Sequence, residues 1–238
     1  GSGDYIYAFR GSNTTTFWRY SITGNNWTSM TVAPGNVSGG SSFVYPGSGD
    51  YIYALQGNPQ AAFWRYSITG NSWTTMANAP GVIMYGSLVY PGSGDYIYAF
   101  QGNNNVFWTY SISGDSWSAA DAPANVSTGG SLVYPGAGDY IYGLQGNNTT
   151  AFWRYSKGGN NWATMAAAPA VNNGASLVYP GSGDYIYTFQ GNSVGAAFWR
   201  YSISGNIWTT MAAAPGTVNQ GGTLVYPGTG DYIYAFQG

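Results

Sequence analysis

The sequence predicts an all-β fold built from a repeat of about 45 residues. The phrase Gly-Asp-Tyr-Ile-Tyr recurs six times, with its aspartate at positions 4, 50, 95, 139, 184 and 231 and spacings of 44 to 47 residues. Between these copies, Tyr, Trp, Phe, Ile and Val gather in short runs that end at clusters of Gly, Pro, Asn and Ser, and no run has helical periodicity. An all-β array with this period is typical of the blades of a β-propeller.

Each repeat contains four short strands, which we name a, b, c and d. In one repeat they are residues 87–90, 96–101, 107–111 and 117–120. Strand b alternates large aromatic residues with small or aliphatic ones, so one face of a blade can interlock with the opposite face of the next. Small residues precede every strand a, as expected for strands that converge on a central axis.

The number of strands of each type gives the number of blades. Strands a, c and d occur five times and strand b occurs six times, which predicts a single five-bladed domain over residues 1–238. Its repeats start near residues 4, 50, 95, 139 and 184, with a partial extra copy from 231. Because the chain opens with strands b, c and d, we expect strand a at 223–226 to complete the first blade and close the ring. The extra strand b at 232–237 then displaces the N-terminal copy, projects as an adhesive edge, or marks a slice of a longer repeat protein.

The third and fourth strands resemble the kelch repeat. Phe-Trp-Arg-Tyr-Ser-Ile-Thr-Gly-Asn-Asn-Trp-Thr at 17–28 has near copies that start at positions 63, 107, 152 and 198. In each copy a Tyr on strand c is followed seven residues later by a Trp on strand d: Tyr20 and Trp27, Tyr66 and Trp73, Tyr110 and Trp117, Tyr155 and Trp162, Tyr201 and Trp208. One departure is that the kelch double glycine at the end of strand b is Gln-Gly here, and Arg10-Gly11 in the first copy. The resemblance implies a propeller whose b–c and d–a loops open on the same face.

The composition excludes much enzyme chemistry. Only 6% of residues are charged, there is no Cys or His, and all eight acidic residues are Asp. A thiol nucleophile, a zinc cluster, an imidazole base and the copper site of galactose oxidase therefore lack their residues. We expect no enzyme activity, no cofactor and no metal. Six basic residues are too few for binding nucleic acid, and no apolar run approaches the length of a membrane span.

Two repeated charged residues are expected to serve the scaffold. The Asp that follows Pro-Gly-Ser-Gly lies between two strands, and a turn carboxylate that accepts hydrogen bonds from backbone amides explains it better than calcium does. Arg19, Arg65, Arg154 and Arg200 share one position of strand c, where we expect a structural pairing with an Asp. A ring that binds an anion is the alternative, although Thr109 breaks the series.

Sequence variation between repeats is concentrated in the b–c and d–a loops, which is where we expect the function. The candidate binding residues are Gln56, Asn58, Tyr85, Gln101, Asn103, Gln145, Asn147, Gln190 and Asn192. Their amides, with nearby aromatics such as Trp64 and Tyr85, are suited to neutral sugars. We therefore expect a non-enzymatic, extracellular or cell-surface module that recognises a neutral glycan or a protein partner on this face. The alternative is a structural subunit of a surface layer or filament that self-associates through strand edges.

Six glycosylation sequons can be read, at Asn13, Asn26, Asn36, Asn125, Asn147 and Asn148. They fit a secreted protein, although a chain rich in Asn and Thr also produces such matches by chance.

Overall fold

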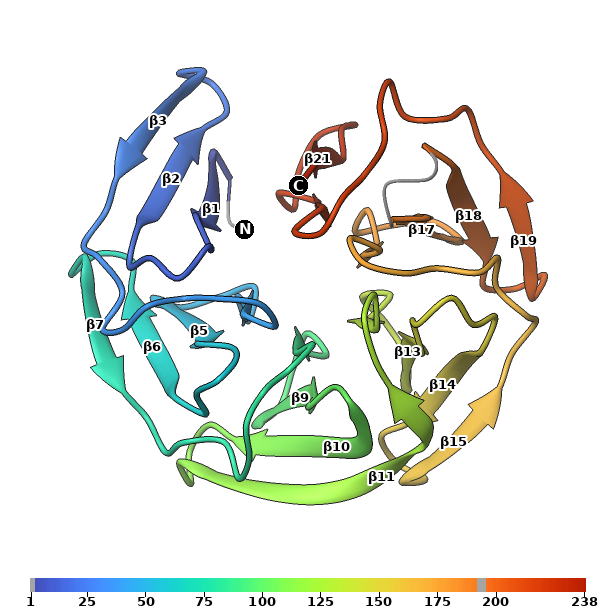
Figure 1. Cartoon of the computed structure of the whole chain (residues 1–238), viewed down its shortest axis with the longest axis horizontal. Coiled ribbons are helices and arrows are strands. Elements are labelled where there is room, and N and C mark those ends of the chain that lie inside the picture. Colours follow the sequence, from blue (N-terminus) through green and yellow to red (C-terminus); the bar gives the residue numbers. More distant parts are fainter. Residues whose placement is uncertain (1–2, 192–195) are drawn as a thin grey trace.

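The chain is an all-β, five-bladed β-propeller arrangement (Figure 1), seen in a computed structural model that describes residues 3–191 and 196–238. Strands of types a and b lie toward the middle of the ring, and those of types c and d lie toward its rim. Within the described residues, no helix is long and apolar enough to cross a membrane.

The strands observed follow the predicted repeat. Strands of type a are β4 (Ser42–Val44), β8 (Ser87–Val89), β12 (Ser131–Val133), β16 (Leu177–Val178) and β20 (Thr223–Val225). Those of type b are β1 (Tyr5–Phe9), β5 (Tyr51–Leu55), β9 (Tyr96–Phe100), β13 (Tyr140–Leu144), β17 (Tyr185–Phe189) and β21 (Tyr234–Phe236). Those of type c are β2 (Phe17–Ser21), β6 (Phe63–Ser67), β10 (Asn104–Ser111), β14 (Phe152–Ser156) and β18 (Phe198–Ser202). Those of type d are β3 (Asn26–Ser29), β7 (Ser72–Thr75), β11 (Ser116–Val126), β15 (Asn161–Thr164) and β19 (Ile207–Thr210).

Four blades are four-stranded antiparallel sheets in the order a, b, c, d, and the first blade has only the three strands β1, β2 and β3. The expected completion of that blade by residues 223–226 is not seen. Strand β20 pairs with β21 instead, with Leu224 opposite Ala235, and the two form a separate two-stranded sheet. This sheet lies between the fifth blade and the first (Figure 1).

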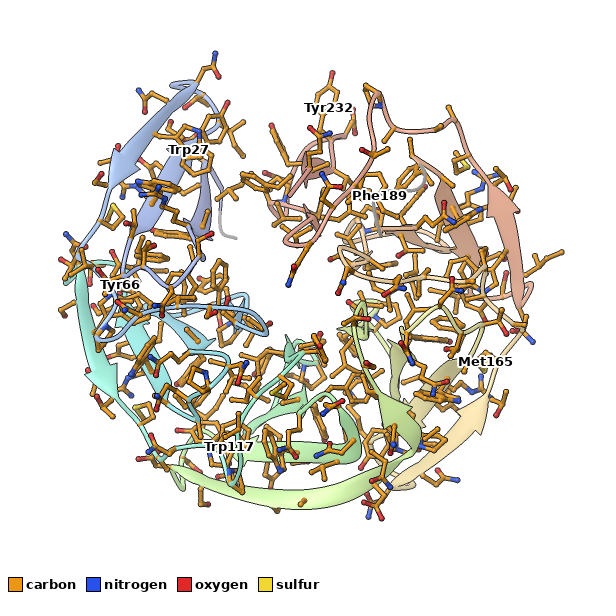
Figure 2. All side chains as sticks on the ribbon, in the orientation of Figure 1. Trp27, Tyr66, Trp117, Met165, Phe189 and Tyr232 are labelled. Atoms are coloured by element: carbon orange, nitrogen blue, oxygen red, sulfur yellow. The ribbon has the colours of Figure 1, made fainter. Side chains whose placement is uncertain are left out.

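Aromatic side chains lock each blade onto the next. Phe17 of the first blade packs edge-on against Tyr66 and Trp73 of the second, with ring centroids 4.9 and 5.0 Å apart. Between the second and third blades, Tyr53 packs in one cluster with Ile97 and the other small or aliphatic residues of the neighbouring strand b. The interlocking of unlike faces predicted from strand b is therefore present, and side chains fill the space between blades (Figure 2).

Glycine is required where loops of neighbouring strands approach most closely. Gly57 follows the glutamine that ends strand b, has φ of 89°, and a Cβ there would lie 2.6 Å from the carbonyl oxygen of Gly39. Gly40, just before strand a, would place a Cβ 2.5 Å from the carbonyl oxygen of Met84 in the next blade. The small residues before strand a thus permit backbone contact between blades near the axis.

Candidate functional site

The b–c and d–a loops lie together on one face of the propeller. The amide N–H of Asn58 donates to the carbonyl oxygen of Gly39 at 2.9 Å, and the amide of Asn147 donates to Thr128 at 2.7 Å. Each b–c loop of these blades is therefore held against the d–a loop of its own blade. This places the start of the variable b–c loops beside the variable d–a loops, over a rigid support.

The glutamines that end strand b point into the scaffold. Their side-chain Nε2 groups donate to carbonyl oxygens of the d–a loops: Gln56 to Asn36 at 2.8 Å, Gln101 to Val82 at 2.9 Å and Gln145 to Asn125 at 2.9 Å. Gln190, at the same place in the fifth blade, is half-buried. The glutamine that ends strand b thus ties this strand to the loop that enters the blade.

The asparagines that begin the b–c loops are differently placed. Asn103 and Asn147 are exposed and Asn58 is half-buried. Asn103 and Asn147 adopt left-handed backbone conformations, with φ of 63° and 54°. In the part of the chain that the structure describes, the side-chain amides of these three residues make no hydrogen bond. Asn192, the fourth asparagine predicted here, lies outside the described residues.

The two aromatic candidates differ in their access to solvent. Tyr85 is half-buried in its d–a loop, and its backbone lies so close to Gly102 that a Cβ there would be 2.5 Å from the Tyr85 nitrogen. Trp64 is only 3% exposed, and it packs with Ala33 and Val37. The expectation that Trp64 offers its ring to a sugar is therefore wrong, because both faces of a blade are covered by neighbouring blades.

The opposite face carries the repeated aspartates, whose carboxylates bind within the blade. In the second blade, Asp50 accepts hydrogen bonds from the Ser67 hydroxyl at 2.5 Å and the Thr69 amide at 2.8 Å. The hydrogen bond from Ser67, followed by that from the Thr69 amide, lowers the pKa of this carboxyl. The same serine and amide pair occurs in four other copies: Ser21 and Thr23 on Asp4, Ser111 and Ser113 on Asp95, Ser156 and Gly158 on Asp139, Ser202 and Ser204 on Asp184. The aspartate has the structural role expected of it, but its amide partners belong to the c–d turn.

The strand c arginines also have a structural partner, which is a tyrosine ring and not an aspartate. The guanidinium carbon of Arg65 lies 4.2 Å from the ring centroid of Tyr51 on the adjacent strand b. Arg19, Arg154 and Arg200 stack in the same way on Tyr5, Tyr140 and Tyr185. In these four blades the positive charge is therefore engaged in a cation–π contact within the blade.

All six sequon asparagines are exposed: Asn13, Asn26, Asn36, Asn125, Asn147 and Asn148. Because Asn147 is also one of the candidate binding residues, a glycan attached there would occupy the same surface as a ligand.

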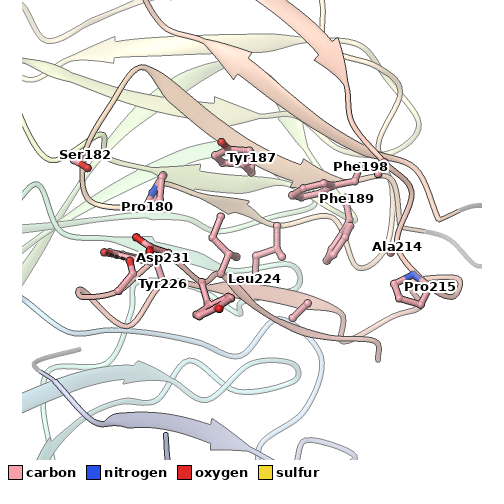
Figure 3. A pocket seen from close by; sticks show the side chains of 15 residues that line it. Pro180, Ser182, Tyr187, Phe189, Phe198, Ala214, Pro215, Leu224, Tyr226 and Asp231 are labelled. Carbon is pink, nitrogen blue, oxygen red and sulfur yellow. Dashed lines mark hydrogen bonds between the residues drawn. The ribbon is translucent and has the colours of Figure 1, made fainter.

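Two hollows were not foreseen from the sequence. A cavity of about 220 Å³ is lined by inner-strand residues of every sheet that contains a strand a, among them Leu88, Val133 and Val178. A larger groove of about 550 Å³ lies between the fifth blade and the C-terminal sheet, lined by Phe189, Phe198 and other residues (Figure 3). The signal for this groove was present in the last repeat, which contains strands a and b but no c and d.

No three residues among His, Cys, Asp and Glu come close enough to hold a metal ion within residues 3–191 and 196–238. Models of known protein families give no match to the chain, and neither do curated proteins.

Proposed function

We propose that this chain is a non-enzymatic, kelch-like binding module that acts outside the cell and recognises a neutral glycan or a protein partner. Its ligand contacts the b–c and d–a loops. Asn58, Asn103 and Asn147 form the core of this surface, with Tyr85 beside them.

The observation that carries the proposal is the difference between the polar side chains of the two faces. On the a–b turn face, the Asp50 carboxylate already accepts two hydrogen bonds from its own blade. On the loop face, the side-chain amides of Asn58, Asn103 and Asn147 have no partner among the described residues, although their backbone amides are bonded within the scaffold. An amide both donates and accepts, which suits sugar hydroxyls and peptide groups and does not require a charged ligand.

The repeat makes the sites similar but not identical, since the b–c loops differ in length and sequence. Each site offers few polar groups, so weak single-site binding reinforced by multivalency is the expected mode.

A glycan array followed by titration calorimetry tests the proposal. We expect saturable binding of a neutral glycan, weakened at least tenfold, or about 1.4 kcal/mol, by the combined variant Asn58→Ala, Asn103→Ala and Asn147→Ala. The matched control is Ser48→Ala with Ser93→Ala, because both serines are exposed in the a–b turns of the opposite face. The protein is produced in a bacterial host, so that glycosylation at Asn147 does not affect the comparison between variants. Equal loss of binding in the control would move the site to the other face.

A second candidate function is that of a structural subunit that self-associates through strand edges. It is favoured by the two-stranded C-terminal sheet, which leaves the outer edge of β21 without a neighbouring strand in the described part of the chain. Glycan binding distinguishes the two functions, because a binding module binds its glycan saturably and a structural subunit does not bind glycans.

A further inference from the structure

The junctions between blades follow one rule along the chain. A Phe on strand c packs edge-on against the strand c Tyr of the next blade, with ring centroids 4.7 to 4.9 Å apart: Phe17 with Tyr66, Phe63 with Tyr110, Phe107 with Tyr155 and Phe152 with Tyr201. The strand d Trp of the next blade completes the contact, as Trp117 does for Phe63 at 4.9 Å. Each blade therefore needs strands c and d of a following blade to cover its aromatic face.

This rule is broken after the fifth blade. The sheet that follows it contains β20 and β21 only, so no strand c or d covers Phe189 and Phe198. The place of the two absent strands is the groove of about 550 Å³, whose lining includes Phe189, Phe198 and Ala214 of the fifth blade and Leu224 of the C-terminal sheet (Figure 3).

The C-terminal sheet is nevertheless seated as the inner half of a blade. Val178 and Phe189 of the fifth blade pack in one cluster with Leu224 of β20. On its other side, Phe236 lies 5.9 Å from Trp27 of the first blade, as Phe9 lies 5.8 Å from Trp73 at a complete junction. Strands β20 and β21 thus have neighbours on both sides and lack only their own outer strands.

The last repeat also lacks polar partners of the earlier copies, since a serine binds the Asp in all five of them and an arginine stacks on the Tyr in four. Asp4 holds Ser21 and the Thr23 amide, and Tyr5 holds Arg19, all from the c–d hairpin beside β1. At the C-terminus the corresponding residues are Asp231 and Tyr232. No hairpin lies beside them in the described structure, and Tyr232 is 74% exposed.

One segment of this chain fits the open place in every respect. The hairpin of β2 and β3 carries Tyr20 and Trp27, the aromatic pair that is missing from the groove. It also carries Arg19, the expected partner of Tyr232, and Ser21, the expected partner of Asp231. It is held by β1, and residues 230–236 repeat residues 3–9 without a difference. The hairpin therefore meets the same strand sequence on β21 as on β1, and it gains a strand a beside that strand.

We propose that the groove between the fifth blade and the C-terminal sheet binds the β2–β3 hairpin of a second copy of this chain. The hairpin exchanges β1 of its own chain for β21 of the other, which completes a four-stranded blade across two molecules. Exchange of identical strands costs little, and each copy still has one groove and one hairpin to offer. The contact is head-to-tail, so it extends to a chain of molecules or to a closed ring of them. The inference concerns a different surface from the loop face and stands without the proposed ligand.

Mass measurement by light scattering is the first test. We expect the full chain to exceed the monomer mass increasingly with concentration, and the variant lacking residues 228–238 to remain monomeric. Because that deletion also removes a strand, the double variant Asp231→Ala and Tyr232→Ala serves as a second probe that leaves β20 and β21 in place. It should lower the association constant at least tenfold with an unchanged melting temperature of the monomer. A full chain that is monomeric at every concentration overturns the proposal.

Cross-linking identifies the partner segment. Tyr5 faces Ser21 in the β1–β2 register, so Tyr232 should face Ser21 of the second copy at a distance that a disulfide can bridge. A Ser21→Cys chain mixed with a Tyr232→Cys chain should form a covalent heterodimer on oxidation, and the natural chain has no cysteine to interfere. Ser111→Cys is the matched control, since Ser111 faces Tyr96 within the third blade and should give no heterodimer. If the chain carrying both Ser21→Cys and Tyr232→Cys cross-links only within itself, the ring closes on its own hairpin and the proposal is wrong.

Discussion

The indole Nε1 of Trp73 donates a hydrogen bond to the carbonyl oxygen of Thr31 at 3.0 Å, which ties the outer strand of the second blade to the segment leaving the first. Trp117 and Trp208 make the same bond to Ala77 and Ala166 in the blades before them. The strand d tryptophan is thus both a packing residue and a link between blades.

One tryptophan shows what the bond requires. The Nε1 of Trp162 is buried without a partner. The blade before it is the third, where Pro123 comes six residues after Trp117; in the second blade Pro80 comes seven residues after Trp73. The shorter segment is part of the long strand β11, in which Asp121, four residues after Trp117, pairs with Val106. The bond therefore depends on the length of the segment between strand d and the proline.

Trp73→Ala should destabilise the protein far more than Trp27→Ala. The substitution at Trp73 removes a hydrogen bond between blades and the ring contact with Phe17. A large-to-small change of this kind lowers the free energy of unfolding by about 3 to 5 kcal/mol, enough to unfold the blade. Trp27 is 47% exposed, and across the junction its ring contacts Phe236 of the partial C-terminal sheet, so its removal should cost roughly 1 kcal/mol. Urea unfolding followed by circular dichroism measures both. Equal losses would mean that Trp27 is buried in solution, as in a ring closed over the first blade.

Acid should weaken the propeller through its repeated aspartates. Hydrogen bonds from Ser67 and the Thr69 amide lower the pKa of Asp50 in the folded state, so its carboxylate contributes stability above the pKa of the unfolded chain, about 3.9. That contribution is lost as the pH falls through the folded pKa. The urea midpoint should therefore decrease between about pH 5 and about pH 2, and less steeply in Asp50→Asn. Ser67→Ala removes the main hydrogen-bond donor to Asp50, so the urea midpoint of this variant should also decrease less steeply with falling pH. A profile identical to that of the parent in both variants would remove Asp50 from the acid transition.

Two glycines allow a matched test of the close approach between loops. Gly102 and Gly94 both have positive φ, 78° and 92°, so alanine strains the backbone at either position by about 1 to 2 kcal/mol. At Gly102 the new Cβ would also lie 2.5 Å from the Tyr85 nitrogen, whereas at Gly94 nothing lies within 4 Å. Gly102→Ala should therefore cost about 1 to 3 kcal/mol more than Gly94→Ala by thermal unfolding. Similar losses would show that the loop carrying Tyr85 moves aside freely.

The sequence was sufficient to predict the strands and the number of blades, because the repeat period and the runs of aromatic and β-branched residues are local properties. Side-chain direction was harder to predict, since a blade has neighbours on both faces and the usual alternation of buried and exposed residues is absent. For this reason the sequence suggests a binding surface for Trp64 and Gln56, although Trp64 is buried and Gln56 bonds to a loop carbonyl. The partners of Asp50 are 17 and 19 residues away, across two strands, a distance at which a turn motif gives no indication.

The two ends of the chain should be individually dispensable and jointly essential. Strand β1 pairs with β2 from Tyr5 opposite Ser21 to Phe9 opposite Phe17, and residues 230–236 offer the hairpin the same sequence. Removing residues 1–11 leaves the C-terminal copy to pair with the hairpin, and removing 228–238 leaves β1 in place. Removing both leaves the first blade without a strand b and exposes the aromatic face against which the second blade packs. That loss amounts to several kcal/mol against a total of about 5 to 15. Melting curves at low protein concentration, where association contributes little, should show a cooperative transition for each single deletion and none for the double. A double deletion that melts like the parent would show that the hairpin needs neither copy of strand b.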